Sequence, residues 1–62
     1  MIAKFIIYRD VSGQYRWRLE ANNSKIIAVC GESFVSKQWA LQSVALVRRL
    51  SQIALIVDRT TR

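Results

Sequence analysis

The sequence contains no proline and no histidine, only two glycines, and a single cysteine, Cys30. Without histidine the commonest general base of enzymes is missing, and one cysteine cannot form a disulfide within the chain. The carboxylates are scattered along the chain rather than clustered: Asp10, Glu20, Glu32 and Asp58. A structural zinc or calcium site therefore has no ligand set. We expect neither an enzyme nor a bound metal or cofactor.

Long apolar runs are also missing. No stretch approaches the roughly 20 apolar residues that cross a bilayer. Residues 1–4 lead directly into a predicted strand, whereas a signal peptide has a basic start and a long apolar centre. A lone cysteine without a disulfide framework suits a reducing compartment. These absences predict a cytoplasmic protein with no membrane contact.

What the chain has is a large apolar fraction in a short length. At 62 residues and 52% apolar, it is near the lower size limit for independent folding. A domain this small buries only about 60% of its unfolded surface, and one core rarely supplies more than about 3–5 kcal/mol. Disulfides and metals are excluded, so we expect association with a second copy to supply the missing stability.

The chain is also basic, with a net charge of +6. Such a charge attracts polyanions such as nucleic acid, and it also serves as a plain solubility charge. The lysines and arginines are spread along the whole chain rather than gathered in one block. Composition alone therefore leaves both interpretations open.

Three segments read as strands separated by turns: residues 3–10, 15–21 and 26–31. The turn at 11–14 contains Gly13, available for a positive φ, and the turn at 22–25 offers Asn22 or Asn23 for the left-handed conformation. Cys30, near the end of the third strand, is predicted to be a buried small hydrophobe. Glu32 is assigned a structural role, neutralising Lys37 or an arginine, with a place at an interface as the alternative.

The second strand alternates strictly, with Tyr15, Trp17, Leu19 and Ala21 on one face and Arg16, Arg18 and Glu20 on the other. Two registers with the first strand are open, and a shift of one residue exchanges the faces of a strand. We expect Ile7 opposite Trp17 and Phe5 opposite Leu19. This requires a loop of odd length or a bulge near Gly13.

Arg16-Trp17-Arg18 at first suggests an aromatic and basic site for nucleic acid. Because Trp17 points away from both arginines, it is predicted to lie in the core. The arginine face remains a candidate phosphate-binding surface, joined by Ile6 and Tyr8 in the expected register. The alternatives are a solvated outer face and a surface covered in an assembly. The residues assigned to possible nucleic-acid binding are Arg9, Arg16, Arg18 and Lys25.

Residues 37–52 are predicted to form a helix with Ser36 as its N-cap. Its apolar arc covers close to half the cylinder, broader than one sheet requires. Residues 54–61 favour a further strand, because Ile56-Val57 and Thr60-Thr61 are β-branched pairs. The joint between them has no glycine or proline, and such a short hinge can direct this strand onto a neighbouring chain as easily as onto its own sheet. The predicted dimer interface is Trp39, Leu46, Leu50, Ile53, Leu55 and Val57.

Taken together, these segments resemble the YegP-like family of small domains of unknown function. The resemblance is carried by Tyr-Arg-Asp at 8–10, Gly13, Tyr-Arg-Trp-Arg-Leu at 15–19, Ala-Asn at 21–22 and Ile-Ile at 26–27. It continues with Glu32, Phe34, Ser36 and Lys37, and with Val57, Asp58 and Thr60. The family's usual Asn-Gly turn is replaced here by Asn22-Asn23-Ser24.

The resemblance implies an α+β fold in which one helix covers an antiparallel sheet, with the element order β-β-β-α-β. It also implies that two units exchange their last strands around a combined sheet. We therefore expect residues 1–62 to form a single YegP-like domain that acts as a homodimer, with larger assemblies left open. The expected function is that of a non-enzymatic interaction module. Nucleic-acid binding through the basic sheet face is the alternative.

Overall fold

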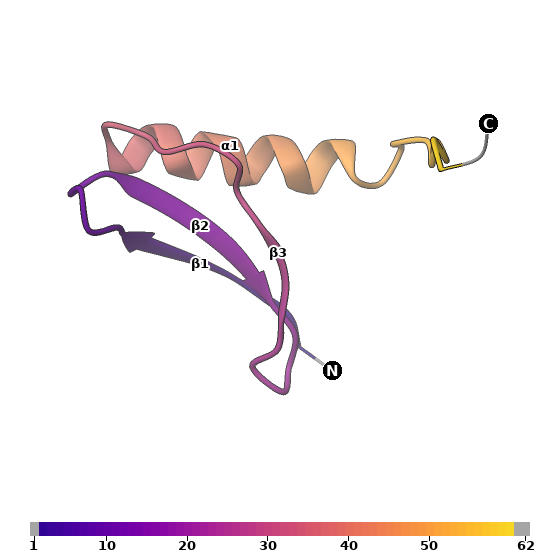
Figure 1. The fold of residues 1–62 in the computed structure, drawn as a ribbon, viewed down its shortest axis with the longest axis horizontal. Helices are drawn as coiled ribbons and strands as arrows, with labels where there is room; N and C mark the ends of the chain where they lie inside the picture. Colours follow the sequence, from indigo (N-terminus) through magenta and orange to yellow (C-terminus); the bar gives the residue numbers. More distant parts are fainter. Residues whose placement is uncertain (1, 61–62) are drawn as a thin grey trace.

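The computed structural model describes residues 2–60. It contains the elements β1 (Lys4–Arg9), β2 (Tyr15–Glu20), β3 (Ile26–Val29) and α1 (Lys37–Leu50). The strands form one antiparallel sheet in the order β1-β2-β3, and α1 lies across one of its faces (Figure 1). This arrangement confirms the predicted α+β class, with strand ends that differ from prediction by one or two residues. Within the described chain, no helix is long and apolar enough to cross a membrane.

The first hairpin has the register expected from the sequence. Ile7 lies opposite Trp17 and Phe5 opposite Leu19. A three-residue loop, 11–13, makes this register possible: the amide of Asp10 donates to the Gln14 carbonyl at 2.8 Å, and Gly13 has φ 85°. Such a loop, a turn followed by a left-handed residue, is a standard hairpin connection.

The Asp10 side chain fixes this first loop. Its Oδ1 accepts the Ser12 hydroxyl at 2.6 Å and the amides of Ser12 and Gln14 at 3.0 Å. The Ser12 hydroxyl bond is the largest influence and, with the two amide bonds, holds the pKa of this exposed carboxyl below its ordinary value of 3.8. The carboxylate form therefore holds the loop together.

The second hairpin repeats the same loop with a different residue at the left-handed position. The Ala21 amide donates to the Lys25 carbonyl at 2.8 Å, and Ser24 has φ 66°. The prediction that Asn22 or Asn23 takes this conformation is wrong. The matching hydrogen bonds place Ser24 where Gly13 stands in the first loop, and Asn23 instead accepts the Lys25 amide through Oδ1 at 3.2 Å.

Replacing Ser24 by glycine is expected to stabilise the domain by about 1 kcal/mol, because a non-glycine residue in this conformation costs about 1–2 kcal/mol. Denaturant unfolding of Ser24→Gly against the parent chain measures the gain. Gly13→Ala is the reciprocal control. A Cβ at Gly13 would meet nothing within 4 Å, so its expected loss of about 1 kcal/mol comes from the backbone alone. Equal stability of the parent chain and both variants would contradict the left-handed conformation of Ser24 and Gly13.

The core is small and centres on Trp17. This indole is only 6% exposed, packs edge-on against Phe5 with ring centroids 5.5 Å apart, and donates from Nε1 to the Ser43 hydroxyl at 3.0 Å. Cys30 and Ala40 complete the set of buried apolar residues in the described chain. The predictions that Trp17 and Cys30 are buried are confirmed.

Helix α1 begins and ends close to the predicted limits. The Ser36 hydroxyl accepts the Trp39 amide at 3.2 Å, which confirms the predicted N-cap. The helix ends at Leu50 rather than at 52, and residues 51–53 form a turn. Among the described elements, α1 packs against β1 and β2 but not against β3. The helix therefore leaves the β3 side of the sheet uncovered.

After α1 the chain runs on past the helix end and away from the sheet (Figure 1). Residues 54–59 carry no strand pairing, so the strand predicted over 54–61 does not form within a single chain; residue 61 lies outside the described residues. A strand needs a hydrogen-bonded neighbour, and none lies beside this segment. Exchange of this strand with a second copy stays a prediction.

Candidate functional site

The side of α1 that faces β3 carries an exposed apolar surface. Trp39, Leu46 and Leu50 are 59%, 45% and 44% exposed, and we call them the apolar flank. They lie on one side of the helix, while Ala40, on a neighbouring part of its circumference, is completely buried against the sheet. The flank was predicted to be part of an interface, and the structure leaves it uncovered in a single chain.

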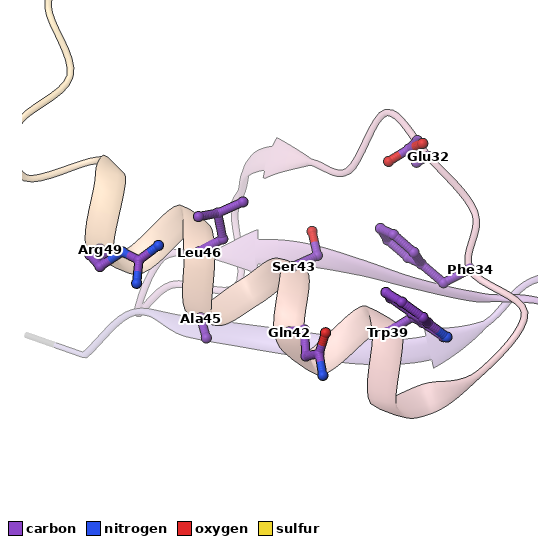
Figure 2. A pocket seen from close by; sticks show the side chains of 8 residues that line it. All are labelled: Glu32, Phe34, Trp39, Gln42, Ser43, Ala45, Leu46 and Arg49. Carbon is purple, nitrogen blue, oxygen red and sulfur yellow. The ribbon is translucent and has the colours of Figure 1, made fainter.

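A groove of about 490 Å³ separates this flank from the segment that follows β3. Phe34 forms its wall opposite the helix and is held by two backbone hydrogen bonds with Tyr15, of 2.7 and 2.8 Å. In Figure 2 the Phe34 ring lies above Trp39, and the side chains of Ser43 and Leu46 point to the same side of the helix. The Ser43 hydroxyl already binds Trp17, so the floor of the groove is mainly apolar.

Strand β3 borders the same region with a free edge. It pairs only with β2, and the exposed fractions of Ile26, Ile27 and Val29 are 55%, 60% and 60%. A register shift between Leu19 and Glu20 interrupts the pairing with β2. The edge carries no proline or charged side chain within Ile26–Val29, the usual protections against pairing with another chain.

The C-terminal segment, residues 53–60, is the third apolar surface, and we call it the tail. Ile53, Leu55, Ile56 and Val57 are 74%, 89%, 98% and 64% exposed. The tail closes in a turn in which Asp58 accepts the Thr60 hydroxyl and amide, and these bonds lower the pKa of Asp58. All six residues predicted for the dimer interface are thus exposed in the single chain, and their assignment to an interface stays a prediction.

The two arginines of β2 lie on the sheet face away from the helix, which we call the outer face. The Arg16 Nη2 donates to the Cys30 carbonyl at 2.8 Å, while its Nε is buried without a partner in the described chain. Arg18 forms an ion pair with Glu20 at 2.7 Å and lies over the Tyr8 ring, 5.1 Å from its centroid.

The other two residues assigned to nucleic-acid binding lie elsewhere. Arg9 pairs with Tyr15, lies 5.2 Å from the centroid of that ring, and so belongs to the helix side of the sheet. Lys25 is in the second hairpin loop. The structure therefore brings Arg16 and Arg18 together, but not the set of four. Instead, Tyr8 lies on the same face as these two arginines. Its position there was indicated by the predicted register of the first hairpin.

The remaining reactive groups have structural contacts. Cys30 is buried, and its Sγ accepts the Glu32 amide at 3.4 Å. Across residues 2–60, no group of three or more cysteines and carboxylates comes close enough to hold a metal ion. The surfaces that stand out are thus an apolar one on the β3 side and a basic one on the outer face.

A three-stranded antiparallel sheet with one covering helix defines the class as a small α+β domain. The family model described as "Domain of unknown function (DUF1508)" matches residues 10–58. A UPF0339 protein of Treponema denticola is 41% identical over 58 residues, which cover 94% of this chain and 98% of that protein. A UPF0339 protein of Neisseria meningitidis serogroup B is 50% identical over 44 residues, covering 71% of this chain and 77% of the relative.

The chain belongs to this DUF1508 family of UPF0339 proteins, and the resemblance to YegP-like domains is confirmed. A solved structure agrees with the assignment. The NMR solution structure of a protein from Haloferax volcanii superposes with a TM-score of 0.85 at 38% identity, covering 90% of this chain and 93% of that one. The family description assigns no function, so function has to be argued from the surfaces of the molecule.

Proposed function

We propose that the protein is a homodimeric interaction module, in which each copy places its tail along the free edge of β3 in the other. The helix flank, the groove and the β3 edge of one copy then form one continuous apolar surface for the second copy. The proposed module is non-catalytic, and its further partner is open. Its biological role would lie in what the assembled dimer presents to other molecules.

The observation that carries the proposal is the surface that a single chain leaves exposed. The accessible area is 5471 Å², against roughly 4,100 Å² for a compact chain of this length. The radius of gyration is 13.4 Å, against about 10.6 Å for a compact domain. The excess area, roughly 1,300 Å², matches what one partner buries in an obligate dimer, about 1,000–2,500 Å².

These surfaces are apolar, which favours their burial against a second copy over exposure to water. Only three apolar residues in the described chain are buried, while most of the exposed large apolar side chains lie on the flank, the β3 edge and the tail; the others are Ile2, Val11, Val35 and Leu41. A strand added to β3 alternates its side chains. In the register that we propose, Leu55 and Val57 point to the helix side and cover the groove, while Ile56 points to the opposite face.

Sedimentation at micromolar concentration tests the dimer. The parent chain is expected to sediment as a dimer, and Leu55→Asp to lose both the dimer and cooperative unfolding, because a carboxylate would be buried in the groove. Val11→Asp is the matched control: Val11 is fully exposed in the first hairpin loop, and its change should leave the dimer intact. A stable, folded monomer of the parent chain would refute the proposal.

A second measurement separates strand exchange from simple contact of the helices. In a dimer made from one isotope-labelled and one unlabelled copy, exchange predicts NOEs between the tail of one copy and β3 of the other. If the dimer shows NOEs between the helix flanks but none between the tail and β3, the two copies associate without exchanging strands, and the exchange part of the proposal is wrong.

A further inference from the structure

We propose that the outer face of the sheet binds single-stranded nucleic acid, with a base stacked on the Tyr8–Arg18 pair and the backbone phosphates held by Arg16 and neighbouring cations. This goes beyond the homodimer, which uses the helix side and the β3 edge. The proposal stands on the combination of an aromatic ring, guanidinium groups and an open sheet face.

The register of the first hairpin brings these groups together. Tyr8 lies directly opposite Arg16, and Arg18 lies diagonally across from it with its guanidinium carbon 5.1 Å from the ring centroid. Opposed side chains on adjacent strands have Cβ atoms about 4.5–5.5 Å apart. The guanidinium of Arg18 therefore contacts Tyr8, while that of Arg16 reaches toward the β3 side of the sheet, where it donates to the Cys30 carbonyl. Trp17, the ring next to them in sequence, points into the core.

The ion pair with Glu20 orients Arg18 rather than removing it from the surface. The Glu20 carboxylate binds Nε at 2.7 Å, and the Arg18 side chain keeps one third of its surface exposed. This fixes the guanidinium plane over Tyr8 before any ligand arrives. Bases stack on aromatic side chains and on guanidinium planes alike, so the pair offers a preformed stacking platform.

The charge of the outer face favours a polyanion. Alternation and strand pairing place Lys4, Arg16 and Arg18 on this face, with Glu20 as the carboxylate among them. Arg16 has no carboxylate partner in the described part of the chain, so its charge is not neutralised, although its Nη2 donates to the Cys30 carbonyl and its Nε is buried. Arg16 and Arg18, two residues apart on one strand, are spaced by about 7 Å, which lets successive phosphates of an extended strand meet successive cations.

The same geometry selects single strands over a duplex and over an acidic peptide. The bases of a duplex are stacked on one another and cannot reach a ring on a sheet face, whereas unpaired bases can. An acidic peptide would satisfy the cations but would leave the Tyr8 platform unused. The face also lies opposite α1, so the proposed dimer leaves it open.

Fluorescence anisotropy of the intact protein with a labelled oligomer of about ten thymidines tests the inference. Binding is expected at low salt and should weaken steeply as salt is added. Tyr8→Leu should weaken it about tenfold, because stacking on one aromatic ring is lost. Tyr8→Phe keeps the ring and should bind like the parent chain.

Arg18→Lys keeps the charge but removes the guanidinium plane, and should weaken binding several-fold. Arg48→Lys, the same change on the exposed helix surface, is the matched control and should have no effect. If circular dichroism shows that Tyr8→Leu does not fold, the comparison of Arg18→Lys with Arg48→Lys tests the inference instead. Sedimentation of each variant shows whether it still forms the dimer, so that a loss of nucleic-acid binding can be distinguished from a loss of the dimer.

Three results would overturn the inference. They are no binding at low salt, equal weakening by Arg18→Lys and Arg48→Lys, and competition by polyglutamate as strong as that by the unlabelled oligomer. The last result would make the outer face a site for acidic peptides or for polyanions in general.

Discussion

Replacing Trp17 by alanine is expected to lower the free energy of unfolding by about 3–5 kcal/mol, which is enough to unfold a domain of this size. Trp17 is 6% exposed, packs against Phe5 and holds Ser43 on the helix. Its loss therefore removes a contact between sheet and helix, the bond to Ser43, as well as the largest buried side chain in the described chain. Denaturant unfolding followed by circular dichroism measures the change.

Arg18→Ala is the control from the neighbouring position on the same strand. Its ion pair with Glu20 is partly exposed, and its contact with Tyr8 lies at the surface, so we expect a loss of about 1 kcal/mol or less. A loss equal to that of Trp17→Ala would mean that the strand does not have one buried and one exposed face.

Leu46→Asp on the helix flank is expected to raise the dimer dissociation constant by at least about a hundredfold. Leu46 is 45% exposed in the single chain, so covering the rest of it contributes roughly 1 kcal/mol per copy. Burying a carboxylate in its place costs at least about 1 kcal/mol more. The symmetric interface contains the site twice, which gives a total of about 4 kcal/mol, and every 1.4 kcal/mol raises the dissociation constant tenfold. Sedimentation across a concentration series measures the constant.

Leu41→Asp is a closely matched control for this change. Leu41 is 49% exposed against 45% for Leu46, lies on the same helix, and is turned about 140° away around the axis. Its replacement should shift the dissociation constant by no more than about threefold. Equal effects at both positions would place the interface elsewhere.

The sheet was predictable from the sequence because short-range rules decide it. Strict alternation in 15–21 fixed which side of Trp17 is buried. It left two registers of the first hairpin open, and the one that we expected required the odd-length loop that the structure shows at 11–13. Ser36 as N-cap followed from the same kind of local chemistry. The left-handed residue of the second loop was missed, because asparagine preference pointed to Asn22 or Asn23, whereas the loop's hydrogen bonds require that conformation at Ser24.

The candidate site was less predictable, because it depends on contacts between strands. Arg9 and Lys25 were grouped with Arg16 and Arg18 by charge alone, yet pairing with Tyr15 turns Arg9 to the other face. The tail illustrates a different limit. Its β-branched residues favour an extended strand, but a strand forms only beside a partner, and residues 54–59 pair with no strand of the single chain.

The meander order of the sheet has a consequence for how the molecule folds. Each strand pairs with the one that follows it in sequence, across loops of three residues. Contacts of such short sequence separation close quickly, so the search within one chain is rapid. If the protein assembles as the dimer proposed above, the slow event is the meeting of two chains, and the rate of reaching the native state is expected to rise with protein concentration.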